Sequence, residues 1–190
     1  MKTKSLGLLS LVCALVSSAT IVASDQDSDS MNEHSETRTY EAKAEDVATL
    51  DGILAAVYDV ISGPAGAARD WDRMRSLLRP EIARLISVGQ SKTGEVAVRS
   101  LTPDEYIENA SGYFANAAFF ESELSRKVEK FGHIAHVFST YQSVAEPGGE
   151  PFDRGINSFQ LMWDENRWWV ITIYWDRETE ANPIPAKYLE

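Results

Sequence analysis

The side chain best suited to acid–base chemistry is His136, in the middle of the apolar stretch 134–138. An imidazole titrates close to neutral pH, so that one placed in a pocket can accept or release a proton under physiological conditions. The stretch alternates as a β-strand does, which puts His136 on one strand face with Phe138. The other interpretation is a core histidine whose ring nitrogens are hydrogen-bonded by a neighbouring strand.

A second group of polar side chains lies in residues 154–163, a predicted strand that is otherwise apolar. Its members are Arg154, Asn157, Ser158 and Gln160. Polar groups on a buried strand need hydrogen-bond partners. They either contact a ligand or satisfy one another and the nearby loops. We predict that any pocket is lined by His136, with Gln160 or Ser158 close enough to share a hydrogen-bond network.

The sequence favours neither a metal nor another cofactor. The only cysteine is Cys13, near the N-terminus. His133 and His136 fall on opposite sides of one predicted strand, so they cannot both bind one ion without distortion. We expect no metal site, no cysteine nucleophile and no cofactor.

Residues 1–23 have the pattern of a secretory signal peptide. Two lysines precede an uncharged run of apolar and small residues, and the polar run SDQDSDS follows. We expect cleavage near Ala23 or Ser24 and a periplasmic or secreted protein. A retained membrane anchor and a lipoprotein modified at Cys13 are the alternatives.

The predicted signal peptide contains two of the 18 basic residues and none of the 29 acidic ones, which leaves a formal charge of −13 on the rest. Phosphate and anionic membranes are bound by clusters of Lys and Arg, and the sequence has no such cluster. We expect no nucleic-acid partner, and no membrane contact after signal removal. Residues 24–42 are polar and acidic and are predicted to be a disordered leader.

Residues 44–118 show mainly helical patterns. The range 44–61 has apolar residues at helical spacing, and a short second helix is capped by Asp70. A third helix is capped by Thr102, with Glu105 completing a capping box. The stretches 82–88 and 95–101 between the last two helices are predicted strands.

The chain after residue 118 is predicted to be β-structure. The predicted strands are 119–130, 133–144, 154–163 and 167–176, followed by an extended tail over 179–190. In the first of them Phe120, Leu124 and Val128 alternate with charged residues, which predicts that these three face the core. Helices separated from a run of antiparallel strands indicate an α+β fold, with the helices on the concave face of a curved sheet.

The strand 167–176 is apolar on both faces. Strict alternation puts Trp169, Ile171, Ile173 and Trp175 on one side of it. Since helices can cover only one face, we predict a homodimer through the outer face of the sheet. Coverage of this face by the leader or by the proline-rich tail of the same chain is the alternative.

This order of elements resembles the nuclear transport factor 2-like superfamily and its SnoaL-like bacterial branch. The resemblance covers residues 44–178 and rests on the ranges 44–61, 71–74, 131–137 and 168–170. It implies a cone with a pocket between the curved sheet and the helices. It also implies that Tyr, Asp and His side chains reach into the cone. The tyrosines and aspartates that could do so are Tyr58, Tyr106, Tyr113, Asp59, Asp72 and Asp176, and their spacing singles out no pair.

Two functions are compatible with these observations. The first is an exported pocket protein that binds a small, partly apolar molecule, with His136, Gln160, Ser158, Asn157 and Tyr58 as candidate pocket residues. The second is a cofactor-independent lyase, isomerase or hydrolase acting on a small organic substrate. Such an enzyme needs a buried acid or base with a shifted pKa, whereas a binding protein needs only an apolar pocket with a few polar anchors.

Overall fold

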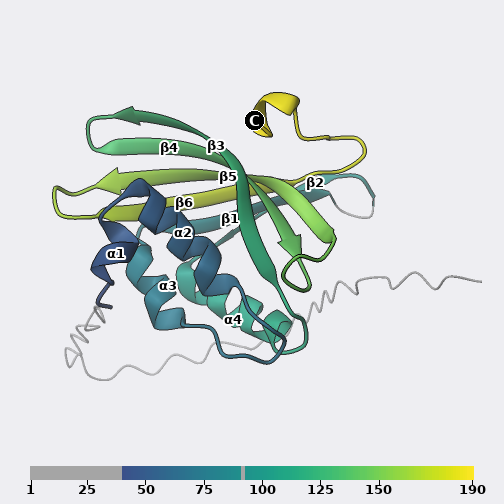
Figure 1. The fold of residues 1–190 in the computed structure, drawn as a ribbon, viewed down its shortest axis with the longest axis horizontal. Helices are drawn as coiled ribbons and strands as arrows, with labels where there is room; N and C mark the ends of the chain where they lie inside the picture. Colours follow the sequence, from purple (N-terminus) through teal and green to yellow (C-terminus); the bar gives the residue numbers. More distant parts are fainter. Residues whose placement is uncertain (1–39, 91–92) are drawn as a thin grey trace, which may run out of the picture. The chain divides into compact units, whose positions relative to one another are not determined.

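The computed structural model describes residues 40–90 and 93–190. A curved sheet wraps around helices on one side, and the C-terminal segment lies on the other side (Figure 1). The predicted signal peptide 1–23 and most of the predicted leader 24–42 lie outside the described residues, so cleavage and export stay predictions. Within the described ranges, no helix combines the length and the apolar character that crossing a membrane requires.

Four α-helices pack on the concave side of the sheet: α1 (Ala44–Val47), α2 (Leu50–Ile61), α3 (Trp71–Leu77) and α4 (Pro103–Phe114). The predicted helix 44–61 is divided because Thr49 has an extended backbone, and its hydroxyl accepts the N–H of Gly52 at 2.9 Å. The predicted caps are confirmed. Asp70 caps α3, and Thr102 forms a capping box with Glu105 at the start of α4.

Six strands form one open, mixed sheet. They are β1 (Arg84–Gln90), β2 (Val96–Leu101), β3 (Phe120–Phe131), β4 (Ile134–Val144), β5 (Pro151–Trp163) and β6 (Trp168–Arg177), in the order β2-β1-β6-β5-β4-β3. All neighbours are antiparallel except β1 and β6, which are parallel. The prediction of an α+β fold is confirmed. The predicted antiparallel sheet needs this one correction, because the β1–β2 hairpin joins the free edge of the last strand.

The inner face of the sheet carries the core. Val137 and Phe159 from the central strands are fully buried, as are Ile53 and Leu54 from α2. Each fully buried large aliphatic or aromatic side chain contributes about 1.5–3 kcal/mol relative to an exposed one, so α2 and the sheet depend on each other for stability.

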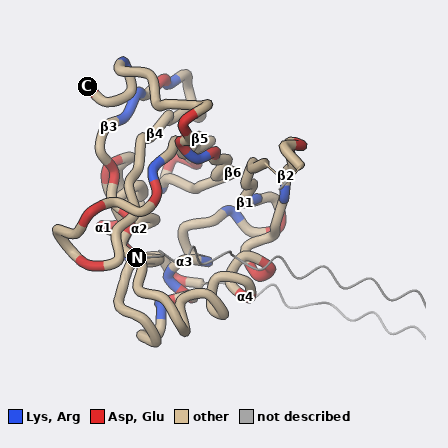
Figure 2. The backbone as a smooth tube through the Cα atoms, turned by 90° about the vertical axis from the view of Figure 1, so that its right-hand side faces the viewer, with Lys and Arg blue, Asp and Glu red and all other residues tan. Residues whose placement is uncertain are grey.

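Lys and Arg are spread over helices and strands along the described chain (Figure 2).

A β-bulge corrects the predicted faces of β6. The pairing with β5 shifts between Gln160 and Leu161, which leaves an extra residue in β6. Val170 and Ile173, three positions apart, are therefore both buried on the inner face. Strict alternation would have separated them, and the predicted grouping of Ile173 with Trp169 is wrong.

The C-terminal tail lies against the outer face of the sheet (Figure 1). Its proline segment is extended, as predicted, but a 3₁₀ turn, η1 (Ala186–Tyr188), follows. The Thr140 hydroxyl donates to the carbonyl of Tyr188 at 2.6 Å, and the rings of Phe138 and Tyr188 lie 5.0 Å apart. The tail of the same chain therefore covers part of this face, whereas Val96 and Val98 of β2 remain 68% and 63% exposed.

The loop between α2 and α3 is held by one buried arginine. The Arg69 guanidinium donates to the carbonyls of Ile61, Gly63 and Ala67 at 2.7–3.0 Å and lies over the ring of Phe114. A side chain at Gly63, whose φ is +156°, would come within 2.7 Å of this guanidinium. Arg69 thus binds three carbonyls of the loop, and the Gly63 carbonyl also accepts the backbone N–H of Phe119 at 3.0 Å.

We expect Arg69→Met to lower the free energy of unfolding by about 2–4 kcal/mol, because several buried carbonyls lose a charged donor. Arg99→Met is the matched control. Arg99 is exposed and makes one side-chain hydrogen bond, to Asn109, so its loss should cost about 0.5 kcal/mol or less. Urea denaturation measures both. Equal effects of the two changes would contradict the role of Arg69.

Candidate functional site

Polar side chains interrupt the apolar inner face of the sheet opposite α2. We call them the inner polar cluster: Tyr58 of α2, Glu121 and Glu123 of β3, Ser139 and Ser143 of β4, and Asn157 of β5. They meet because Glu121 pairs with Ser143 across β3 and β4, and Glu123 with Tyr141, which puts both carboxylates on the helix side. The cluster lies inside the cone.

Hydrogen bonds join the cluster into a chain. The amide of Asn157 donates to the Tyr58 hydroxyl at 3.2 Å, and that hydroxyl lies 2.6 Å from the hydroxyl of Ser139. Ser139 in turn donates to the carboxylate of Glu123. Burial raises the pKa of Tyr58 above its ordinary value. Tyr58 therefore stays neutral at all ordinary pH values and acts as a hydrogen-bond donor within the core.

Glu121 is the titratable group of the cluster. Its carboxylate accepts from the Ser143 hydroxyl at 3.0 Å and from the Asn157 amide at 3.4 Å. Burial, with a smaller contribution from the charge of Asp153, raises the pKa of Glu121 to about 7, although the two hydrogen bonds oppose the shift. No Lys or Arg side chain of the described residues forms an ion pair with it. Glu121 can therefore gain or lose a proton near neutral pH.

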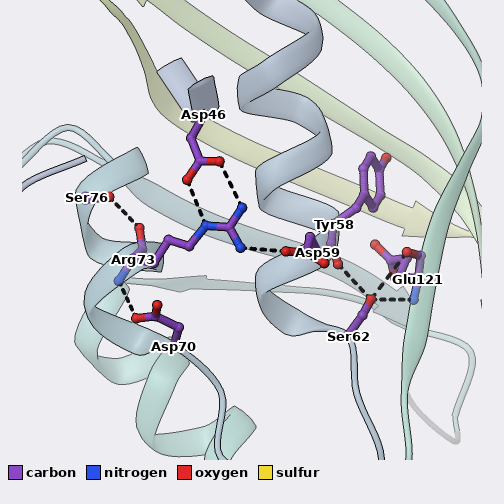
Figure 3. Close-up of polar contacts among 8 residues, drawn as sticks. All are labelled: Asp46, Tyr58, Asp59, Ser62, Asp70, Arg73, Ser76 and Glu121. Atoms are coloured by element: carbon purple, nitrogen blue, oxygen red, sulfur yellow. Dashed lines mark hydrogen bonds and ion pairs between the residues drawn. The ribbon is translucent and has the colours of Figure 1, made fainter. Parts of the chain in front are cut away.

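The carboxylates on the opposite side of α2 serve a different purpose (Figure 3). Arg73 binds Asp46 through two hydrogen bonds, at 2.7 and 2.9 Å, and also contacts Asp59. The hydrogen bonds from Arg73 lower the pKa of Asp46. This ion-paired group joins α1, α2 and α3. Asp59, a candidate from the resemblance, is thus part of a structural ion pair.

Ser62 ties the end of α2 to β3 next to the cluster (Figure 3). Its hydroxyl donates to the carbonyl of Tyr58 at 2.7 Å and accepts the backbone N–H of Glu121 at 3.0 Å. The strand position that carries the Glu121 side chain is therefore fixed by the helix that carries Tyr58. The backbone therefore fixes the positions of Tyr58 and Glu121 relative to each other.

An apolar pocket of about 270 Å³ opens between α4 and the sheet. Its walls, which we call the aromatic pocket, include Tyr106, Ala110, Tyr113, Phe114, Phe119 and Trp175. The pKa of Tyr106 is raised first by burial and then by the negative charge of Glu121. The phenol that lines the pocket therefore lies within electrostatic reach of the Glu121 carboxylate. A molecule in this pocket would have aromatic walls and the Arg99 side chain at its edge, whereas Glu121 itself lines a separate hollow between α2 and β3.

The five predicted pocket residues fall on two faces of the sheet. Tyr58 and Asn157 belong to the inner polar cluster, as described. His136, Gln160 and Ser158 lie on the outer face, because their strand neighbours Ala135, Val137 and Phe159 are the ones buried under the helices. The expected hydrogen bond exists, since the Gln160 amide donates to Nδ1 of His136 at 2.5 Å.

The prediction that His136 lines a pocket in the cone is therefore wrong. As ligand contacts on the outer face, Gln160 and Ser158 stay predictions. Arg154 lies 3.5 Å from the carboxylate of Glu178, and His133 contacts the carbonyl of Trp163 at 3.1 Å. In the described chain no three His, Cys, Asp or Glu side chains gather as a metal site would require.

Glu121, Ser139 and Ser143 were missed by sequence reasoning. The pattern of β3 predicted that Leu124 and Val128 face the core. Val128 pairs with the buried Val137 and lies on the helix side, but both residues are 43% exposed. A bulge between Glu123 and Ser125 changes the register of this edge strand, and its first half turns acidic residues inward. The small hydroxyl residues that alternate at 139 and 143 were the signal that could have indicated a polar interior.

Glu121 should make stability depend on pH in a defined direction. A carboxyl whose pKa rises from 4.5 to about 7 on folding stabilises the fold when protonated. That contribution is complete below about pH 4.5 and is lost as the pH rises to about 7, at a cost of about 3 kcal/mol at most.

We therefore expect the unfolding free energy of the wild type, relative to Glu121→Gln, to fall by that amount between pH 4 and pH 8. The control Glu129→Gln removes an exposed carboxylate of the same strand and should show no such trend. Denaturation curves of the wild type and of both variants at several pH values measure these free energies of unfolding. A constant difference between wild type and Glu121→Gln would contradict the shifted pKa.

Comparisons with known proteins bear on the fold alone. No family model matches the sequence, and no curated protein matches it. Solved structures do match. A protein of unknown function with a cystatin-like fold from Nostoc punctiforme has a TM-score of 0.51 and 10% identity, over 69% of this chain and 90% of its own.

Two further structures agree. A proposed dehydratase of the NTF2-like family from Streptomyces avermitilis has a TM-score of 0.50 and 16% identity, over 70% of this chain and 96% of its own. A protein of unknown function from Mycobacterium tuberculosis has a TM-score of 0.51 and 12% identity, over 74% of this chain and 80% of its own. The SnoaL-like branch stays a prediction. The described domain has the fold of the nuclear transport factor 2-like superfamily.

Proposed function

We propose that the protein binds a small, partly apolar molecule in the aromatic pocket. The observation that carries this proposal is the wall of aromatic side chains around that pocket, one of which, Tyr106, lies within electrostatic reach of the Glu121 carboxylate. Small-molecule sites are usually concave, mostly apolar and equipped with a few polar groups that orient the ligand. Tyr106 and Asn109 supply polar groups at the pocket wall.

A second candidate function is a cofactor-independent lyase, isomerase or hydrolase. The pKa of Glu121 favours it, because a general base or acid is most effective when its pKa lies near the working pH. Glu121 would accept a proton from a carbon of the bound molecule, and the neutral Tyr106 hydroxyl would donate a hydrogen bond to the oxygen that becomes negative. The name of the Streptomyces avermitilis relative, a proposed dehydratase, is compatible with this class.

The ketone 2-tetralone tests both functions, since it is aromatic and has exchangeable protons next to its carbonyl. We expect it to bind, and Ala110→Leu to weaken binding at least tenfold by filling the aromatic pocket. Ala55→Leu, on the exposed face of α2, is the matched control and should bind as the wild type does. NMR titration measures the affinity.

Proton exchange in D₂O separates the two functions. If the protein is an enzyme, it accelerates deuterium incorporation into 2-tetralone, and Glu121→Gln lowers that rate about 100-fold or more without losing affinity. Binding without acceleration supports the binding protein. Failure of 2-tetralone to bind, or equal binding by the Ala110→Leu variant, would contradict the proposed site.

We also propose that the exported protein forms a homodimer through the part of the outer face that its tail leaves open. Val96 and Val98 of β2 support this, because such exposed aliphatic side chains on a sheet face favour association. Ile173, which is buried inside, takes no part in that surface.

Sedimentation at micromolar concentration should give a dimer for the wild type and a monomer for Val98→Asp, which places a charge in the interface. Val128→Asp is the control, since Val128 is 43% exposed on the opposite edge strand and should leave the dimer intact. A monomeric wild type would overturn the dimer.

A further inference from the structure

The C-terminal tail is fastened to the outer face at two places and bridges the surface between them. Near its start, the carboxylate of Glu178 accepts the backbone N–H of Ile184 at 2.9 Å. Near its end, Tyr188 is held by Thr140, and the Ser125 hydroxyl donates to the carbonyl of Glu190. Pro183 and Pro185 flank Ile184. Proline fixes its own φ and has no N–H to pair with a strand, so the bridging segment does not join the sheet.

A pocket of about 460 Å³ lies between this segment and the sheet. The segment itself runs on the side of the sheet away from the helices (Figure 1). We call the pocket the outer slot. Its floor is Phe138, Ile156, Ser158 and Tyr174, and the tail contributes Ile184 and Tyr188. With Trp175, four aromatic side chains therefore surround a space of the size that small organic ligands occupy. The outer slot is separate from the aromatic pocket inside the cone, apart from Trp175, which borders both.

One carboxylate of the outer slot has no ionic partner among the described residues. Asp176 lines the slot, and its carboxylate accepts only the backbone N–H of Arg177, at 2.8 Å. No Lys or Arg side chain within 40–90 and 93–190 pairs with Asp176. Arg177, the one basic residue of the lining, is bound to Asp153 at 2.9 Å, and the second lining carboxylate, Glu178, lies 3.5 Å from Arg154. Asp176 is therefore the lining carboxylate without an ionic partner, beside the rings of Phe138 and Tyr174, while Lys187 lies over the Tyr188 ring at 4.6 Å.

We propose that the outer slot binds a small organic cation, an amine or a quaternary ammonium with an apolar body. The faces of Tyr and Phe rings attract cations. A carboxylate without an ionic partner also attracts them, over a longer distance. The apolar floor takes up the body of the ligand. Anionic molecules such as fatty acids are disfavoured by Asp176 and Glu178. The inference is independent of the function proposed for the cone.

Three probes of similar size test the charge preference. Benzyltrimethylammonium is a cation, benzyl alcohol is neutral and benzenesulfonate is an anion. Calorimetric or NMR titration of the full protein should show the cation binding at least tenfold more tightly than the alcohol, and the anion no more tightly than the alcohol. Equal affinities for the three probes, or no binding of the cation at millimolar concentration, would overturn the proposal.

Variants locate the binding. Asp176→Asn should weaken binding of benzyltrimethylammonium about tenfold and leave benzyl alcohol unaffected, and Tyr174→Leu should weaken the cation more than the alcohol. Glu129→Gln makes the same change of charge on the outer face of β3, outside the slot, and should bind as the wild type does. Equal losses in Asp176→Asn and Glu129→Gln would show a nonspecific charge effect and contradict the site. An unchanged affinity in Asp176→Asn would contradict it as well.

Discussion

The contact between α2 and the inner face of the sheet is the interaction on which the rest of the structure depends. Ile53 and Leu54 are fully buried in it, and Tyr58 packs its ring edge against Phe159. The same contact removes polar groups of three strands from water. Because an unpaired buried polar group costs about 1–3 kcal/mol, the hydroxyls and amides beneath α2 must pair with one another. The inner polar cluster is the result, and Glu121 is its one member whose charge can change near pH 7.

Two arrangements of carboxylates flank α2, and they differ in their cationic partners. Asp46 and Asp59 share Arg73, which lowers the pKa of Asp46 and joins three helices. Glu121 has only neutral donors, Ser143 and Asn157, so burial decides its pKa. The first arrangement ties three helices together. The second leaves an acid with neutral hydrogen-bond partners inside the cone, and this difference is the physical basis for placing the proposed function there.

Local signals predicted the helices and the order of the strands well. The capping box of Thr102 and Glu105 depends on four consecutive residues, and it occurs as expected. The faces of the strands were harder to predict. Bulges in β3 and β6 add Leu124 and Ile171 and reverse the alternation beyond them, which is why Val170 and Ile173 are both buried on the inner face although they are three positions apart. A bulge depends on the pairing of two strands, and a single strand sequence does not contain that information.

The same reason explains the candidate site. His136 and Gln160 were correctly predicted to interact, since their strands are neighbours. Which set of alternate residues on these strands faces the helices is decided by the packing of α2. Glu121 looked like a solvated charge on an edge strand. Its environment arises from residues that are 22 and 36 positions away along the chain. Long-range contacts of this kind created the acid that sequence patterns did not reveal.

The most direct test of this account is an NMR titration of the side-chain carboxyl carbon of Glu121 in the folded protein. The account predicts a midpoint at about pH 7, because burial without a cationic partner disfavours the charged form. The signal is assigned by its loss in Glu121→Gln. A midpoint near the ordinary value of 4.5 would show that water or a cation reaches the carboxylate, and it would contradict the account of the inner polar cluster.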